Sequence, residues 1–206
     1  HFSPMGLRQG VSWNCPVDEL HETDDATLAQ RAAAGCVESF AALARRYQVP
    51  VVHYVRRLVG GDRRGEADDV AQEAFLRAWR RIDRYDRRWA FSTWLFTIAR
   101  RTWLNQARAT RRRRTRETAV VTAGVDESEP FAAAIATERA TRLWDVASAE
   151  LAEPAFTAIW LRYVEEKPLA EIGLVLDKPA ATVKVILFRA RRRLKPFVRH
   201  LGVGVE

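Results

Sequence analysis

Hydrophobic residues recur every three or four positions in several separate stretches of this chain. Residues 24–47 and 51–59 both have this spacing, which places apolar side chains on one face of a helix. Thr23 or Asp24 is expected to cap the first helix, because a short polar side chain accepts a hydrogen bond from the first turn. Pro50 is expected to bend or restart the chain, since proline has no backbone N–H.

The stretch 66–86 predicts the next helix, with a single apolar face. Its apolar members are Val70, Ala74, Phe75, Ala78 and Ile82. Their spacing keeps them on one side of a helix. A loop is expected over Asp83 to Ala90. The sequence "FSTWLFTIARRTWLNQARATRRRR" then predicts a further helix, which is apolar first and arginine-rich later.

Residues 117–130 lose the helical period and become acidic, which predicts a linker. A second helical block begins near Phe131 and ends in three short helices, at 154–165, 168–176 and 180–195. The separators "EEKP" and "DKPA" are turn-like, with proline near the start of the following helix. We therefore expect an all-α fold of two small helical domains joined by a flexible linker. The divisions are a flexible lead over 1–23, a first domain over 24–115, a linker over 116–136 and a second domain over 137–200.

The last two helices have the spacing of a helix-turn-helix. Ala170, Ile172 and Gly173 lie where such a motif needs small or apolar contacts. The expected buried stripe of the final helix is Val183, Leu187, Ala190 and Leu194. Its exposed arc then contains Val185, Phe188, Arg189 and Arg192, with Ile186 on the flank. A basic exposed arc after a tight turn favours entry into the DNA major groove over a merely solvated charged face.

Net charge narrows the choice of partner. The chain carries a formal charge of +8, which fits a polyanion such as nucleic acid. Between Arg87 and Arg116 there is no acidic residue, and aromatic residues alternate with the arginines. Single-stranded nucleic acid is held by aromatic stacking in a basic groove. The alternative is that these aromatics are core residues. Trp94, together with its neighbour Leu95, is the first choice for the core.

Other classes of protein lack support in the sequence. The two cysteines, Cys15 and Cys36, form no CxxC pair and lie away from the histidines, which argues against a zinc site or a disulfide scaffold. Cys36 is expected to be a small core residue. No catalytic motif is present, so we expect no enzyme, no metal, no cofactor and no small-molecule substrate. No apolar run is long enough for membrane insertion and no secretory signal is seen, so the expected location is cytoplasmic.

Three quoted stretches carry a resemblance to a known family. "ADDVAQEAFLRAWRRIDRYD" followed by "FSTWLFTIARRTWLNQARATRRR" resembles region 2 of the extracytoplasmic-function (ECF, group 4) sigma factors of the sigma-70 family. "LRYVEEKPLAEIGLVLDKPAATVKVILFRARRRLK" resembles their region 4, and "DDATLAQRAAAGCVESFAALARRYQ" resembles their opening helix. The resemblance covers residues 24–115 and 137–197. It implies an RNA polymerase sigma factor that recognises the −10 and −35 promoter elements, melts the promoter and starts transcription.

The resemblance also implies roles for particular residues. Those expected on the clamp helices of the polymerase beta-prime subunit are Asp68, Asp69, Gln72, Glu73 and Arg77. Those expected on the −10 element, including a flipped base of its single-stranded non-template strand, are Arg84, Arg87, Arg88, Trp89, Phe91, Arg100, Arg101, Asn105 and Arg108. Those expected on the −35 element are Thr182, Lys184, Val185, Phe188, Arg189 and Arg192. The beta flap of polymerase and an anti-sigma factor are further expected partners.

One stretch departs from the family pattern. The family usually shows T-V-K-S-R-L-H-R-A where this chain has T-V-K-V-I-L-F-R-A. Val185, Ile186 and Phe188 therefore stand where polar residues are usual. Apolar side chains there can contact thymine methyl groups or favour DNA shape, or they can form a protein-docking patch. A plain helix-turn-helix regulator is the alternative to a sigma factor, but it leaves the pattern of residues 66–115 without a function.

Overall fold

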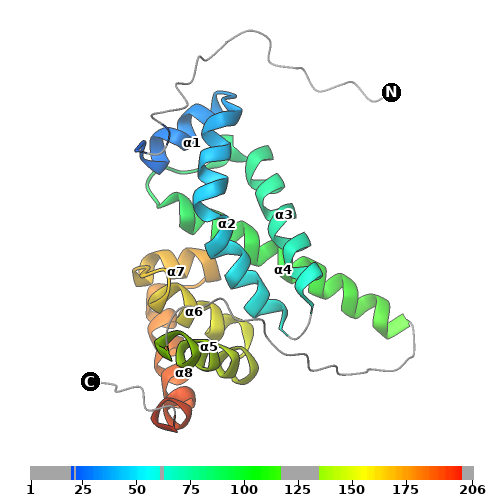
Figure 1. Cartoon of the computed structure of the whole chain (residues 1–206), viewed down its shortest axis with the longest axis vertical. Coiled ribbons are helices and arrows are strands. Elements are labelled where there is room, and N and C mark those ends of the chain that lie inside the picture. Colours follow the sequence, from blue (N-terminus) through cyan, green and yellow to red (C-terminus); the bar gives the residue numbers. More distant parts are fainter. Residues whose placement is uncertain (1–19, 21, 61–62, 117–134, 201–206) are drawn as a thin grey trace.

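Helices make up the structured part of the chain in a computed structural model, which describes residues 20, 22–60, 63–116 and 135–200 (Figure 1). In these ranges the model contains helices and no strand, so the expected all-α fold is confirmed. The helices are α1 (Asp25–Ala33), α2 (Val37–Val59), α3 (Arg64–Arg80), α4 (Phe91–Arg116), α5 (Ile135–Glu150), α6 (Glu153–Tyr163), α7 (Leu169–Leu176) and α8 (Ala180–His200), with a 3-10 turn at Ile82–Arg84.

The first two helices follow the capping rules. Asp24 caps α1 by accepting a hydrogen bond of 3.0 Å from the backbone N–H of Thr27, as expected. Gly35, with φ of 105°, then reverses the chain in a conformation that favours glycine. Cys36 is buried, as expected, and its sulfur also caps α2. Of the two outcomes expected at Pro50, a restart does not occur, because α2 runs through it and buried residues on both sides keep the helix packed.

The helix expected over 66–86 is shorter than its apolar pattern suggested. α3 ends at Arg80, and Arg81 leaves the helical conformation with φ of −125°. The chain then makes the 3-10 turn, which still buries Ile82 against the core. Packing of Ile82 therefore does not require a continued α-helix. The prediction of a helix up to residue 86 is wrong, and the loop before α4 is correspondingly longer.

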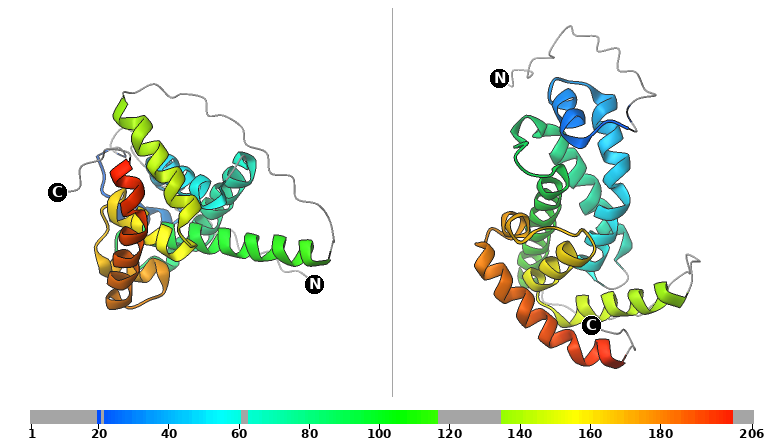
Figure 2. Two further views of the ribbon diagram at one scale, coloured as in Figure 1. Left: turned by 90° about the horizontal axis from the view of Figure 1, so that it is seen from below. Right: turned by 90° about the vertical axis from the view of Figure 1, so that its left-hand side faces the viewer.

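The helices form two lobes that share one apolar core. α1 to α4 make the first lobe and α5 to α8 the second, with α7 against α4 and with α5 and α6 against α2 (Figures 1 and 2). α6 is buried around its whole middle, over residues 156–161. The packing of the second lobe against the first was not predicted from the sequence. Most of the expected linker, and nearly all of the expected lead over 1–23, lie outside the described residues.

The second half of α4 extends beyond the body of the first lobe (Figures 1 and 2). Among the residues of α4 up to Arg112, whose burial is described, Thr102 is the last that is buried, and the helix continues to Arg116. From Asn105 to Ala109 every side chain is exposed. α4 is therefore a core helix over its first half and a projecting arm over its second.

Candidate nucleic-acid interfaces

The turn between α7 and α8 is tight, as a helix-turn-helix requires. Asp177 ends α7 in the left-handed conformation with φ of 56°, and the backbone N–H of Lys178 donates 2.9 Å to the carbonyl of Gly173. A Cβ atom at Gly173 would lie 2.5 Å from the carbonyl oxygen of Lys178. Ile172 is buried, whereas Ala170 is exposed. Gly173 is thus a position at which the backbone of the turn leaves no room for a side chain.

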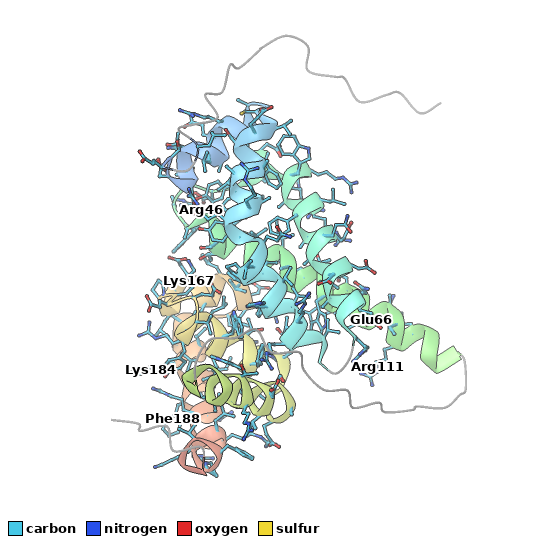
Figure 3. The ribbon with its side chains drawn as sticks, viewed as in Figure 1. Arg46, Glu66, Arg111, Lys167, Lys184 and Phe188 are labelled. Atoms are coloured by element: carbon cyan, nitrogen blue, oxygen red, sulfur yellow. The ribbon has the colours of Figure 1, made fainter. Side chains whose placement is uncertain are left out.

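The faces of α8 are those expected from its sequence. The residues of the expected buried stripe, Val183, Leu187, Ala190 and Leu194, are all buried. Val185 and Phe188 are exposed by 47% and 58%, and Ile186 is half-buried on the flank. The other residues assigned to the −35 element are all exposed: Thr182, Lys184, Arg189 and Arg192. Figure 3 shows Lys184 and Phe188 on α8. The second helix therefore presents an apolar pair surrounded by cations.

The five residues assigned to polymerase binding lie on α3 and differ in their partners. Arg56 donates a hydrogen bond of 3.1 Å to Asp68, and Arg77 pairs with Glu73 at 2.6 Å. Asp69 and Gln72 are exposed, and within the described part of the chain the side chain of neither makes a hydrogen bond or an ion pair. These two residues are therefore the members of the set that a partner protein can engage without breaking an internal contact.

The loop before α4 forms one wall of an open hollow of about 560 Å³. Tyr85 donates 2.8 Å to the carbonyl of Trp89, Arg87 donates to Gln30, and Arg88 pairs with Asp86 at 2.6 Å. Hydrogen bonds from the Arg88 side chain and backbone lower the pKa of Asp86. Trp89 is 37% exposed and lies beside the hollow. Arg84 is exposed but does not line the hollow.

Two residues assigned to the −10 element are covered in this conformation. Phe91 is only 1% exposed, and it packs on Tyr47, Tyr85 and Trp94. Of the other aromatics of this stretch, Phe96 is buried and Trp94 and Trp103 are half-buried. The core interpretation therefore holds for most of them. Leu95 is fully buried, as expected.

Arg100 is the second covered residue. It donates 2.5 Å and 2.9 Å to the carboxylate of Glu153 and 3.2 Å to the carbonyl of Val175, both in the second lobe. Its side chain is 11% exposed. Burial opposes the charged form, but hydrogen bonding to Glu153 and the charge of that carboxylate outweigh it, and the pKa of Arg100 is raised. By contrast Arg101, Asn105 and Arg108 are exposed along α4.

Further polar contacts join the two lobes beside Arg100. Tyr54 and Thr157 share a buried hydrogen bond of 2.9 Å, and burial raises the pKa of Tyr54. The ammonium of Lys167 donates 2.5 Å to Ser92, next to the hollow. Thr93 donates to Glu171, and Arg57 pairs with Asp145. The base of α4 and the edge of the hollow are thus covered by α6 and α7.

The sequence analysis did not predict the contacts between the two lobes, neither the first-lobe residues that make them nor the second-lobe residues. It also missed the first-lobe residues Asp25, Arg46 and Tyr47, which line the hollow. Tyr47 donates to the carboxylate of Asp25, which also pairs with Arg46, and burial, then this carboxylate, raises the pKa of Tyr47. One signal was available in the second lobe: residues 156–161 are apolar apart from Thr157. A helix that is apolar on all sides is buried on all sides.

The fold and these surfaces define a helical protein that binds nucleic acid through a helix-turn-helix. Two family models match the chain: Sigma-70 region 2 over residues 43–113 and Sigma-70, region 4 over residues 142–194. In the described ranges, no group of three or more His, Cys, Asp or Glu residues could hold a metal. Nor does any helix there combine the length and the apolar character needed to cross a bilayer.

Curated relatives and solved structures agree with the family models. The ECF RNA polymerase sigma factor SigW of Bacillus subtilis (strain 168) is 31% identical over 175 residues, which cover 81% of this chain and 92% of SigW. The ECF RNA polymerase sigma-E factor of Escherichia coli (strain K12) is 31% identical over 193 residues, 85% of this chain and 96% of that protein. The chain therefore belongs to the ECF sigma factors of the sigma-70 family, which are transcription initiation factors.

Two solved structures share the fold. Sigma factor RpoE from Bartonella quintana, in complex with the anti-sigma factor NepR, matches with a TM-score of 0.67 and 19% identity over 79% of this chain and 98% of that chain. CnrH, in complex with the cytosolic domain of CnrY, matches with a TM-score of 0.61 and 24% identity over 85% of this chain and 97% of that chain.

Proposed function

We propose that this chain is a group 4 sigma factor that binds core RNA polymerase in the cytoplasm and directs it to a specific set of promoters. It has no catalytic site of its own. Promoter melting is driven by binding energy for flipped, unpaired bases. The observation that carries this proposal is the presence, in one chain, of an exposed polar face on α3, a basic helix α4 and a helix-turn-helix at α7–α8.

In this proposal the lobes have separate tasks. α3 docks on the clamp helices of the beta-prime subunit, with Asp69 and Gln72 at the centre of the contact and Asp68, Glu73 and Arg77 around them. The second lobe binds the beta flap. Asp69 and Gln72 suit this role because both are exposed and neither has a hydrogen bond or ion pair to give up among the residues that the structure describes.

The −10 element is taken up by the loop before α4 and by α4 itself. The hollow beside Trp89 accepts the flipped base, with Arg87 and Arg88 lining it and Arg84 outside it, while Arg101, Asn105 and Arg108 hold the strand. Flipping costs a few kcal/mol of unstacking, which stacking and hydrogen bonds in such a pocket offset. Arg100 reaches DNA only if α6 and α7 move away from α4, because Glu153 holds it in the closed arrangement. Phe91 is instead covered by Tyr47, Tyr85 and Trp94 of the first lobe.

Regulation by an anti-sigma factor is part of the proposal. RpoE of Bartonella quintana has been solved with its anti-sigma factor NepR, and by similarity we assign a partner of that kind to this chain. Binding of such a partner to either lobe would prevent polymerase from reaching α3 or α8. The matching experiment is co-purification of an inhibitory protein with this chain, followed by loss of transcription when the captured protein is added to the reconstituted reaction.

The function is tested by reconstitution. Purified chain is mixed with core RNA polymerase, the complex is isolated by gel filtration, and run-off transcription is measured on promoters that the complex binds. We expect stable binding to core polymerase and transcripts that depend on the added chain. Retained duplex binding without polymerase binding would instead support a plain helix-turn-helix regulator, and the sigma factor assignment would be wrong.

The apolar pair on α8 predicts a methyl contact in the −35 element. Val185 and Phe188 are exposed among Thr182, Lys184, Arg189 and Arg192, and apolar side chains in the major groove contact the thymine methyl group. Replacing a contacted thymine by uracil should weaken holoenzyme binding roughly fourfold, the value of one buried methyl group of about 0.8 kcal/mol. The combined change Val185→Ser and Phe188→His should abolish this difference between thymine and uracil.

The control is Val164→Ser, which removes an exposed valine at the end of α6, and it should keep the thymine preference. If uracil has no effect at any −35 position, while the double variant loses an anti-sigma factor or the beta flap, the pair is a protein-docking patch. Unchanged preference and unchanged partner binding would exclude both roles.

A further inference from the structure

The projecting half of α4 packs on the lobe at its start, where Trp103 lies half-buried against the core. From Trp103 to Arg112, the part of this half whose side chains the structure describes, no side chain is buried. The helix continues to Arg116, fourteen residues beyond Thr102, which at 1.5 Å per residue is roughly 21 Å. Figures 1 and 2 show this part standing away from the lobe. Apolar burial stabilises most protein helices. A helical arm with so little apolar burial is expected to contact a partner.

Charge is the main property of this arm. Its arginines are Arg111, Arg112, Arg113, Arg114 and Arg116, and Arg108 precedes them on the same helix. Arg108, Arg111 and Arg112 are exposed. Like charges three and four positions apart repel each other on a helix, and residues 108 and 112 stand in that relation. A polyanion along this surface would remove the repulsion, so the arm fits an anionic partner better than it fits bulk water.

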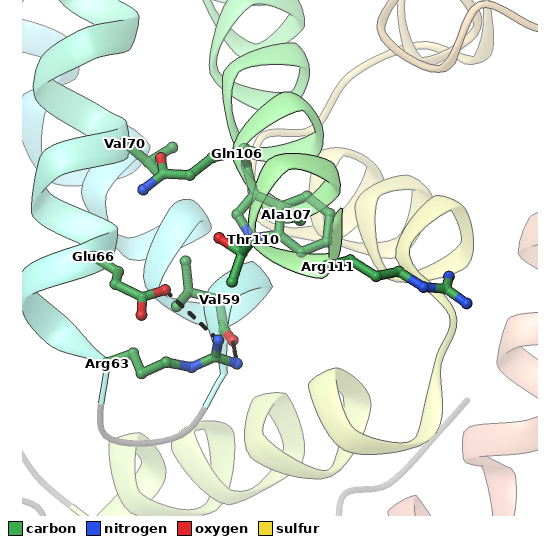
Figure 4. A pocket seen from close by; sticks show the side chains of 9 residues that line it. Val59, Arg63, Glu66, Val70, Gln106, Ala107, Thr110 and Arg111 are labelled. Atoms are coloured by element: carbon green, nitrogen blue, oxygen red, sulfur yellow. Dashed lines mark hydrogen bonds and ion pairs between the residues drawn. The ribbon is translucent and has the colours of Figure 1, made fainter. Parts of the chain in front are cut away.

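The arm stays apart from the lobe along its near side. A cavity of about 360 Å³ lies between them, lined by Trp103, Gln106 and Thr110 of α4 and by Val59 and Arg63 opposite. Figure 4 shows Arg111 pointing away from the wall that carries Glu66. That carboxylate pairs with Arg63 at 3.6 Å.

We propose that this arm, defined as Arg111–Arg114 and Arg116, binds the phosphates of the duplex between the −10 and −35 elements, without reading its sequence. The proposal rests on the proposed function. α4 holds the −10 strand with Arg101 and Asn105, and the arm continues that helix directly. Arg116 also begins the segment that leads to the lobe that binds the −35 element. In chain order, the arm therefore lies between the residues assigned to the −10 element and those assigned to the −35 element.

Duplex DNA explains the composition of the arm better than a protein partner does. Protein interfaces depend on aromatic and other apolar anchors, and the arm has no aromatic residue after Trp103. Phosphate contacts position a protein on DNA and need only cations and polar groups. Because phosphates repeat along the whole duplex, such contacts are independent of base sequence.

The test measures how holoenzyme binding to promoter DNA depends on salt. Each phosphate neutralised by an arginine contributes roughly 0.9 to the slope of log K against log salt concentration. Changing Arg111, Arg112, Arg113 and Arg114 together to glutamine should therefore lower the slope by roughly 3 to 4. The matched control changes the same four residues to lysine, which keeps the charge on the same helix and should keep the slope.

A second DNA locates the contact. Neutral methylphosphonates across the duplex between the two elements should lower the slope of the unchanged holoenzyme, and the glutamine variant should then show no further decrease. If that variant binds core polymerase and keeps the full slope on ordinary DNA, the proposal is wrong. It is also wrong if the decrease persists on the neutral duplex. Failure of the unchanged chain to bind core polymerase would instead contradict the proposed function.

Discussion

The combined change Asp69→Ala and Gln72→Ala is expected to weaken binding to core RNA polymerase by roughly 30-fold to 1,000-fold, the range of about 2–4 kcal/mol found for residues at the centre of protein interfaces. Both side chains are exposed on α3. Alanine favours helix, so the stability of the lobe should change by less than about 0.5 kcal/mol. The measurement is a titration of labelled core polymerase, with thermal unfolding of each variant alongside.

A control for this experiment removes one charged and one amide side chain, three positions apart, from another exposed helical surface. Arg45 and Gln48 are exposed on α2, and their change to alanine should leave polymerase affinity within about twofold, as for surface residues outside an interface. Polymerase affinity that survives the loss of Asp69 and Gln72 would place the docking surface elsewhere. Asp68 and Glu73 are less suitable for this test, because each already has an arginine partner.

Replacing Gly173 by alanine is expected to destabilise the second lobe by about 1–3 kcal/mol, the usual effect of overpacking, and valine should do more. The new Cβ would lie 2.5 Å from the carbonyl oxygen of Lys178. That oxygen belongs to the backbone of the turn, so relief requires the turn to move and α8 to rotate with it. For a chain of this size we expect a fall of roughly 2–4 °C in the melting temperature per kcal/mol, together with weaker −35 binding.

Gly65 provides the matched control. It lies in the first turn of α3, and a Cβ atom there would have nothing within 4 Å. Gly65→Ala should therefore be neutral or should stabilise the chain by up to about 1 kcal/mol. Equal melting temperatures for Gly173→Ala and the unchanged protein would mean that the turn adjusts easily, and that the close approach of its backbone to Gly173 is not required.

Local periodicity was enough to predict the helix-turn-helix. Val183 and Leu187 are buried, and Val185 and Phe188 are exposed, because spacing along one helix determines which side faces its neighbours. The same reasoning placed Val70, Ala74 and Ala78 on the buried side of α3. It failed at the end of α3, where a 3-10 turn buries Ile82 without continuing the helix. Apolar spacing cannot distinguish these two ways of burying one residue.

Contacts between distant parts of the chain were beyond the reach of such patterns. Arg100 is one of several arginines on α4, and nothing in its neighbourhood in sequence distinguishes it from the exposed Arg101. Its partner Glu153 is 53 positions away, in a helix whose packing on the first lobe depends on tertiary structure. The walls of the hollow at Asp25 and Lys167 were missed for the same reason.

The ion pair between Arg100 and Glu153 changes how substitutions at these positions must be interpreted. Replacing Arg100 alone leaves a mostly buried carboxylate without its partner, which can cost roughly 3 kcal/mol in stability. Loss of transcription in that variant would therefore combine a missing DNA contact with a damaged fold. A double-mutant cycle over positions 100 and 153 separates the two, because only the structural part shows coupling between the residues. Arginine-by-arginine scanning along α4 is informative only where the side chain has no such second role.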